Sequence, residues 1–409
     1  MNWIRDNSKI SSTDLEKVFK YEEKRTTVIT WANDNIKPIV NEFEDSQWEG
    51  WLANLCPEHP SSEPNVFIVL AQAGKESPSN KFGDESVFVT TGGGQRNLRT
   101  VPFSKETFRR ITDTFYIHGS ISAVISRADV PVFSSSQVLM KSDDGEMHTA
   151  HVYNCRSSNE WSRDLALTVT HLPDLHKTFC IMFGCDEETK AAVIKRLSGI
   201  GTEISFPLIM PAILIELERL RHLRVTTKAI ESMETKIAEL DFDTDKMDEE
   251  SGPGTVVLRN AARRTTWLDA AYLQNGLISW KFQLEKLKGC VTTYPESHPT
   301  KCLRGTGERV AARIEAIEEE YDQIILNCKM RLEGMSMATQ WVRDVTYKPA
   351  SLSNADILPG SRRDKYGHSQ GHKSRLQAYE SNSVDHDDIL TGYFPRGCVF
   401  DVFLQLANL

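Results

Sequence analysis

The sequence predicts an α+β protein with three parts. Residues 1–205 form a mixed α/β sheet domain, residues 206–342 form long antiparallel helices, and residues 343–409 form a poorly structured tail. Short apolar runs between turn residues fill the first part, as in strands. From Pro211 onward apolar residues recur every three or four positions, as in helices. Between residues 347 and 380 the chain is rich in Ser, Gly, His, Arg and Lys, without either period.

The first sixty residues carry three tryptophans in polar surroundings and predict helices packed at a sheet edge. The run 66–70 is apolar and lies between Pro64 and Gly74, which predicts a buried strand. In 165–170 Leu and Val alternate with Ala and Thr, which predicts a strand with one wetter face. Further strands are expected at 86–90, 115–125, 130–140, 151–155, 165–171 and 178–183.

Helix signals begin at Asp186, a predicted N-cap for a helix that ends near Gly199. Pro211 suits the first turn of a long helix that continues to about Leu240. An acidic linker that contains Gly and Pro is expected at 241–254. A second long helix should cover about 257–287, followed by a loop at 288–307.

The last long helix has the clearest period in the chain. Its apolar residues fall on two neighbouring rows with sevenfold spacing, the pattern of a coiled-coil seam that packs against another helix. Arg331 interrupts one row. We call these positions the heptad seam: Leu303, Val310, Ile317 and Ile324 on one row, and Ile314, Tyr321, Cys328 and Met335 on the other.

Composition limits the function. The formal net charge of -9 argues against a nucleic-acid binder, because phosphate recognition needs a basic face. The longest apolar run, 206–215, holds two prolines and is far shorter than the roughly 20 residues of a transmembrane helix. The N-terminus lacks the apolar stretch of a signal peptide, and none of the 8 cysteines forms a CxxC pair. We expect a soluble, cytoplasmic chain with reduced thiols, membrane-associated only through a partner.

One candidate metal site stands out. Asp241, Asp243 and Asp245, the acidic triplet, share the opening spacing of a calcium loop. Position six of that loop should be glycine and is Lys246, and position twelve should be glutamate and is Gly252, so an EF-hand is rejected. The acidic triplet is either a solvated linker or a weak Mg²⁺ site. No other cofactor is expected.

The histidines and the potential nucleophiles give no comparable pattern for a metal site or a catalytic site. The pairs His148 with His151 and His171 with His176 lack the additional ligands that zinc requires, which favours surface or strand-edge histidines. No Gly-x-Ser-x-Gly elbow and no cysteine signature of a catalytic site occurs. The sequence therefore predicts no catalytic residues and a protein that is not an enzyme.

Part of the chain resembles a known family. The stretch from Trp161 to about Met233 is similar to the fungal branch of the CorA-like divalent-metal (Mg²⁺) transporters. The resemblance implies an N-terminal α/β domain that leads into long stalk helices, the last of which enters the membrane. The family's Gly-Met-Asn tripeptide is absent, and the near match at 334–336 lies inside the heptad helix, so no transport role is assigned to it. The residues that carry the resemblance are Ser162–Leu167, His171–Pro173, Pro207–Pro211 and Glu216–His222.

Three functions remain open from the sequence. The first is a truncated or divergent CorA-like cytosolic part that does not transport ions alone. The second is a coiled-coil interaction or regulatory protein, with the heptad helix used for self-association or for binding a related membrane protein. The third is an unrecognised enzyme.

Overall fold

The computed structural model describes residues 9–32, 38–55, 65–72, 74, 97–126, 131–142, 145–157, 164–245, 253–297 and 301–346. By its contacts the chain separates into Met1–Lys348 and Pro349–Leu409. The strand expected at 86–90 and the tail beyond Thr346 lie outside the described residues. The boundary expected between residues 205 and 206 stays a prediction.

A seven-stranded mixed sheet organises the first half of the chain, in the order β3-β2-β4-β9-β8-β7-β6. The central strands β4 and β9 run parallel, and all other neighbours in this sheet are antiparallel. The strands are β2 (Thr26–Ala32), β3 (Ile39–Phe43), β4 (Asn65–Gln72), β6 (Val132–Lys141), β7 (Met147–Arg156), β8 (Ala166–Leu172) and β9 (Lys177–Cys185). A separate parallel pair joins β1 (Lys20–Tyr21) to β5 (Thr100–Val101).

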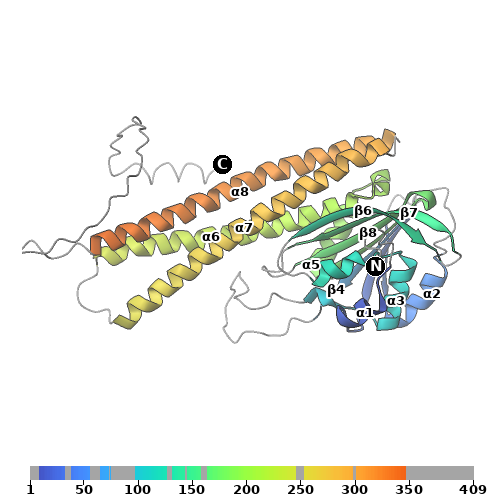
Figure 1. Ribbon diagram of the computed structural model, residues 1–409, viewed down its shortest axis with the longest axis horizontal. Coiled ribbons are helices and arrows are strands. Elements are labelled where there is room, and N and C mark those ends of the chain that lie inside the picture. The colour runs from blue at the N-terminus through green and yellow to red at the C-terminus, as the bar shows by residue number, and fades with distance from the viewer. Residues whose placement is uncertain are drawn as a thin grey trace, which may run out of the picture. The chain divides into compact units, whose positions relative to one another are not determined.

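Helices cover both faces of the sheet (Figure 1). The shorter ones are α1 (Ser12–Lys17), α2 (Trp48–Ala53), α3 (Lys105–Thr114), α4 (Ser120–Ser126) and α5 (Glu187–Leu197). Three long helices follow and form what we call the stalk: α6 (Ile209–Asp245), α7 (Pro253–Ser297) and α8 (Lys301–Thr346). Short 3₁₀ turns occupy Asp45–Gln47, Asn97–Arg99, Pro173–Leu175 and Thr202–Ser205.

Two hydrophobic cores lie on opposite faces of the sheet. In β9, Phe179 and Ile181 pack into one core with α1 to α4, while Cys180 and Met182 pack into the other with α5 and the stalk. This alternation is the period of two that a strand imposes on its side chains. The wetter face predicted for 165–170 is wrong, because Thr170 is fully buried and its hydroxyl donates to the carbonyl of Tyr116 at 3.1 Å.

Two parts of the first half differ from the prediction. The first sixty residues contain the expected helices α1 and α2, but they also supply β2 and the edge strand β3. The strand expected at 115–125 is wrong, because α3 ends at Thr114 and α4 follows. Tyr116 adopts a left-handed φ of 51° between the two helices. The backbone therefore turns within the apolar stretch for which a strand was expected. Among the described residues, the other predicted strands are present, at 66–70, 130–140, 151–155, 165–171 and 178–183.

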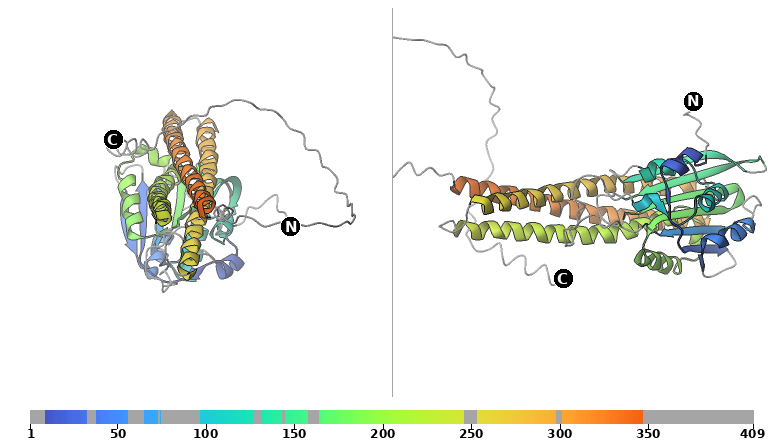
Figure 2. Two further views of the ribbon diagram at one scale, coloured as in Figure 1. Left: turned by 90° about the vertical axis from the view of Figure 1, so that its left-hand side faces the viewer. Right: turned by 90° about the horizontal axis from the view of Figure 1, so that it is seen from below.

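The stalk helices run side by side and are longer than expected (Figure 2). The loop predicted at 288–307 is wrong, since α7 continues to Ser297 and α8 begins at Lys301. Val291 and Tyr294 are buried and extend the apolar face of α7, so tertiary packing overrides the weak helix propensity there. The acidic linker is shorter as well, because α6 extends to Asp245.

The heptad seam is confirmed. Ile314, Ile317, Tyr321 and Cys328 are almost completely buried between the stalk helices. Arg331, which interrupts one row, forms an ion pair with Glu234 of α6 at 2.7 Å. No helix in the described part of the chain is long and apolar enough to cross a membrane.

Candidate functional site

The junction between the sheet and the stalk buries a group of charged and polar side chains, which we call the junction network. A group of this kind is the unusual feature of the fold, because charged residues are rarely fully buried unless they are paired. Its members come from the end of β7, the start of β8 and the helices α6 and α8. They are Arg156, Ser157, Asp164, Glu218, Arg221, His222 and Tyr321.

Arg156 and Asp164 form an ion pair at the sheet side of the junction. The guanidinium donates to the Asp164 carboxylate at 2.9 Å, and both side chains are almost completely shielded from solvent. Arg156 also donates to the carbonyls of Val124 and Ile125 at 2.7 and 2.9 Å, near the end of α4. Burial raises the pKa of Asp164, while Arg156 opposes that shift. The pair ties the end of β7 to α4 in the layer of short helices.

Glu218 and Arg221 form the first part of the network on α6. The Nε atom of Arg221 donates to Oε2 of Glu218 at 3.0 Å, and Glu218 is fully buried. Burial raises the pKa of Glu218 to about 6, and the charge of Arg221 opposes the rise. A carboxyl group with such a pKa changes its charge close to neutral pH.

His222 connects α6 to α8. Its Nδ1 atom lies 2.6 Å from the hydroxyl of Tyr321, and its Nε2 atom lies 3.4 Å from Oε2 of Glu218. The imidazole ring also stands edge-on to Trp280 of α7, with ring centroids 5.6 Å apart. Burial lowers the pKa of His222 well below its usual value and raises the pKa of Tyr321. One side chain therefore contacts both of the other stalk helices.

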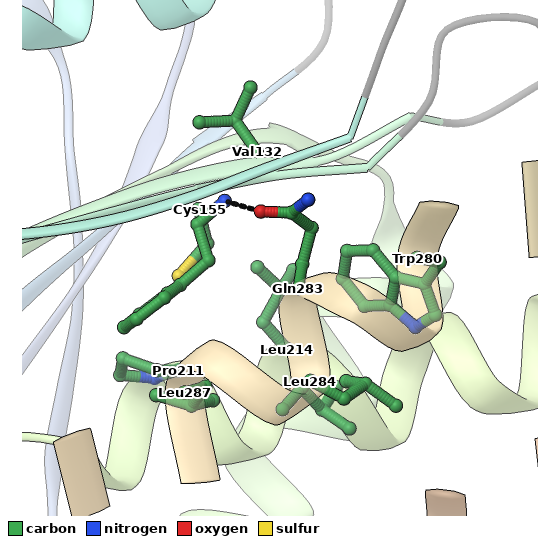
Figure 3. Close-up of a pocket in the computed structure, with 10 residues that line it drawn as sticks. Val132, Cys155, Pro211, Leu214, Trp280, Gln283, Leu284 and Leu287 are labelled. Carbon is green, nitrogen blue, oxygen red and sulfur yellow. Dashed lines mark hydrogen bonds between the residues drawn. The ribbon is translucent and has the colours of Figure 1, made fainter. Parts of the chain in front are cut away.

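Gln283 joins α7 to the sheet a short distance away (Figure 3). Its side-chain oxygen accepts a hydrogen bond from the backbone N–H of Phe133 at 3.0 Å. Around it, Cys155, Pro211 and Leu287 line a cavity of about 10 Å³, which is about the size of one water molecule. Around Gln283, the described residues of α6, α7 and the sheet are therefore closely packed.

The buried cysteines near the sheet are not activated as nucleophiles. Burial raises the pKa of the thiols of Cys155, Cys180 and Cys185, so these cysteines remain protonated and inert at neutral pH. The five cysteines whose side chains are described are free thiols.

The predicted metal site lies away from this junction. The acidic triplet falls in the last two turns of α6, in place of the linker that was expected there, and its side chains lie outside the described residues. Among the described residues no group of three His, Cys, Asp or Glu side chains could hold a metal ion. Weak Mg²⁺ binding by the acidic triplet stays a prediction.

The histidines take structural positions. His151 and His171 face each other across β7 and β8, with ring centroids 6.3 Å apart, and both contact the ring of Tyr294. His171 also lies 2.8 Å from the hydroxyl of Thr178. His176 adopts a left-handed φ of 52° at the turn before β9. The surface or strand-edge position expected for the histidines is wrong for His148 and His171, which are buried on the inner strands β7 and β8.

The outer face of the stalk carries a second feature of interest. Five large apolar side chains of α7 are exposed on the side of the helix opposite its buried face, and we call them the outer stripe: Trp267, Leu268, Tyr272, Ile278 and Phe282. Tyr272 and Phe282 are 58% and 54% exposed. Between residues 265 and 280 the only charged residue is Asp269. On α8, Leu326, Met330 and Met337 are exposed on one face as well.

The exposed residues of α7 and α8 lie at similar heights along the stalk. Lys281 of α7 and Asp322 of α8 form an ion pair at 2.8 Å, which fixes the antiparallel register of the two helices. In that register Ile278 lies within about one residue of Leu326, at a rise of ~1.5 Å per residue. Large contiguous apolar patches on a folded protein are typical of interaction surfaces.

The sequence of α6 contains a signal for the junction network. On α6 the buried positions Leu214, Glu218, His222, Val225 and Ala229 follow one helical face. Two of these five are polar, so the apolar period of the helix is interrupted by a carboxyl and an imidazole. Polar residues in phase with an apolar face predict a buried polar contact. Their partners on other elements could not be found from spacing alone.

Comparisons with known proteins leave the family of this chain open. No family model matches the sequence, and no curated protein matches it. Among solved structures it is similar to the full-length CmaX protein, with 10% sequence identity over 80% of this chain and 81% of that chain. The TM-score of that match is 0.36, and a likeness at this level carries no functional conclusion.

Proposed function

We propose that this chain is a non-catalytic assembly protein, organised like the cytosolic part of the CorA-type transporters that its sequence resembles. In this proposal the sheet domain is fixed to the stalk by the junction network, and the stalk binds a second copy of itself through the outer stripe. The observation that carries the proposal is the outer stripe, an apolar surface on a helix whose opposite face is already packed.

Charge favours a second copy as the partner. The chain as a whole has a net charge of -9, so two copies repel each other over most of their surfaces. Asp269 is the only charged residue between 265 and 280, and Glu285 near Phe282 is accompanied by Lys281 and Lys286, so the outer stripe has little net negative charge to repel a second copy. Two-fold pairing would bring the same aromatic residues of both copies together, and such residues supply most of the binding energy in interfaces.

The absence of catalysis is part of the same proposal. The junction is packed, the buried thiols beside it stay protonated, and the sequence contains no elbow or nucleophile motif. Metal binding would be secondary, through weak contacts of the acidic triplet with hydrated Mg²⁺. A related membrane protein that presents a similar apolar helix is the alternative partner for the outer stripe.

The oligomeric state tests the proposal directly. Light scattering coupled to size-exclusion chromatography should show a dimer or larger assembly of the parent protein at tens of micromolar. The double variant Tyr272→Glu and Phe282→Glu should be monomeric with an unchanged helical circular dichroism spectrum. The matched control, Thr292→Glu and Thr293→Glu, adds the same charge to exposed positions of α7 beyond the outer stripe and should behave like the parent.

A monomeric parent protein would refute self-association. Equal dissociation of the stripe variant and the control would show that charge, and not the outer stripe, controls assembly.

A further inference from the structure

A cavity of about 370 Å³ opens between α5, α6 and α8, away from the junction and from the outer stripe. Its floor is apolar and includes Ile213, Ile314 and Ile317, which are almost completely buried. Ile200, Ile209 and Val310 complete this floor. A volume of this size falls within the range of ligand sites, about 300–1,000 Å³. The cavity therefore has room for an aliphatic chain.

The rim of the cavity is cationic. Arg196 of α5 and Arg309 and Arg313 of α8 line it, together with one carboxylate, Glu216 of α6. The excess of guanidinium groups contrasts with the acidic chain as a whole. Apolar walls beneath a positive rim are complementary to a molecule with an aliphatic tail and an anionic head.

Two of the three arginines already have counter-charges. Arg313 forms an ion pair with Glu216. Arg309 pairs with Glu203 at 3.0 Å and also donates to the hydroxyl of Thr306 at 3.3 Å. Both pairs hold their guanidinium groups in place at the mouth of the cavity.

Arg196 differs from the other two. Its Nη1 atom donates to the carbonyl of Ala192 at 3.2 Å, and no carboxylate of the described residues lies within ion-pair distance of it. A basic residue in the last turn of α5 also complements the helix dipole. Lys195 occupies the same turn and provides that interaction without lining the cavity. The helix terminus alone therefore does not account for the position of Arg196.

We propose that this cavity binds a free aliphatic carboxylate of medium chain length, with the tail on the isoleucine floor and the head on Arg196. A single guanidinium without a carboxylate partner matches the single charge of a carboxylate, and the two groups form paired hydrogen bonds. A phosphate monoester, with a charge of about -1.5 to -2 at neutral pH, matches the rim less well. This site is independent of the proposed self-association.

Isothermal titration calorimetry with decanoate, below its micelle-forming concentration, tests the proposal. Decanoate should bind the parent protein saturably, and decanol and decyl phosphate should bind more weakly. Decanol has the same tail without the charge, and decyl phosphate has the same tail with a different anion. Equal affinity for decanol would overturn the role of the rim, and tighter binding of decyl phosphate would overturn the choice of a carboxylate.

Variants locate the site. Arg196→Ala should weaken decanoate binding roughly ten-fold or more, the usual effect of removing a charged hydrogen-bond partner. Lys195→Ala, in the same turn of α5, should leave binding unchanged. Ala212→Leu places a larger side chain into the cavity from α6 and should abolish binding while the protein still unfolds cooperatively. Equal effects of the two α5 variants, unchanged binding by Ala212→Leu, or no saturable heat with the parent would each refute the site.

Discussion

The buried carboxyl group of Glu218 should make the stability of this protein fall as the pH rises toward neutral. Burial raises its pKa from 4.5 to about 6, even though Arg221 opposes the rise. Because the folded protein holds this proton more tightly than the unfolded chain, the stabilising contribution is complete below pH 4.5 and is lost as the pH rises through 6. A shift of this size corresponds to about 2 kcal/mol of unfolding free energy.

His222 contributes to the pH dependence of stability with the opposite sign. Burial lowers its pKa well below 6.5, so its stabilising contribution is present above pH 6.5 and is lost as the pH falls. The two groups partly cancel in the parent protein, and only a variant can separate them. Glu218→Gln serves this purpose, because glutamine resembles a protonated carboxyl group and does not titrate.

Urea unfolding followed by tryptophan fluorescence measures the effect at a series of pH values. The unfolding free energy of the parent minus that of Glu218→Gln should fall by about 2 kcal/mol between about pH 4 and about pH 7. The pKa shift of His222 comes mainly from burial and from Arg221, which both proteins retain, so most of its contribution cancels in the difference. Glu231→Gln, an exposed position on α6, should give a profile parallel to that of the parent. Parallel profiles for Glu218→Gln as well would refute the burial argument.

Three further predictions concern the stalk and the acidic triplet. Ile317→Asp should lower the unfolding free energy by about 3 kcal/mol or more, since it places an unpaired charge in the heptad seam, whereas Ala316→Asp on the exposed face should cost little. Gln283→Leu should destabilise the protein by about 1–3 kcal/mol, and hydrogen exchange should show faster exchange at the Phe133 amide alone. Calorimetry should find Mg²⁺ binding no tighter than millimolar that disappears when the acidic triplet is changed to Asn; tight binding that survives the change would place the metal elsewhere.

Sequence reasoning succeeded where the signal is local. The heptad seam was predicted because residues seven apart on one helix share a face whatever the rest of the fold does. Most of the strands were predicted because apolar runs bounded by turn residues are also local signals in the sequence. Errors occurred where distant packing decides the local structure, as at Val291 and Tyr294, which keep α7 helical past the expected loop.

The contacts of the junction network were harder to predict from the sequence than the helices and strands. His222 and Tyr321 are 99 positions apart, and Gln283 and Phe133 are 150 apart, so their contacts follow only from the complete topology. The resemblance pointed to the segment that contains Glu218 and His222, without indicating that both are buried. The acidic triplet attracted attention because its spacing is a local pattern, and a helix now occupies that position.

The polar contacts of the junction give the stalk a fixed register on the sheet that apolar packing alone specifies poorly. An apolar interface tolerates small displacements and repacking, whereas a buried hydrogen bond is lost when its atoms move apart. Gln283 contacts the N–H of Phe133 on β6, the edge strand of the sheet, so α7 also covers an edge that would otherwise offer an unpaired donor. His222 fixes α6 against α8 in the same way, through Tyr321. Burial of Glu218 lowers stability at neutral pH, and we expect the defined geometry between the sheet and the stalk to be what this buried group contributes in return.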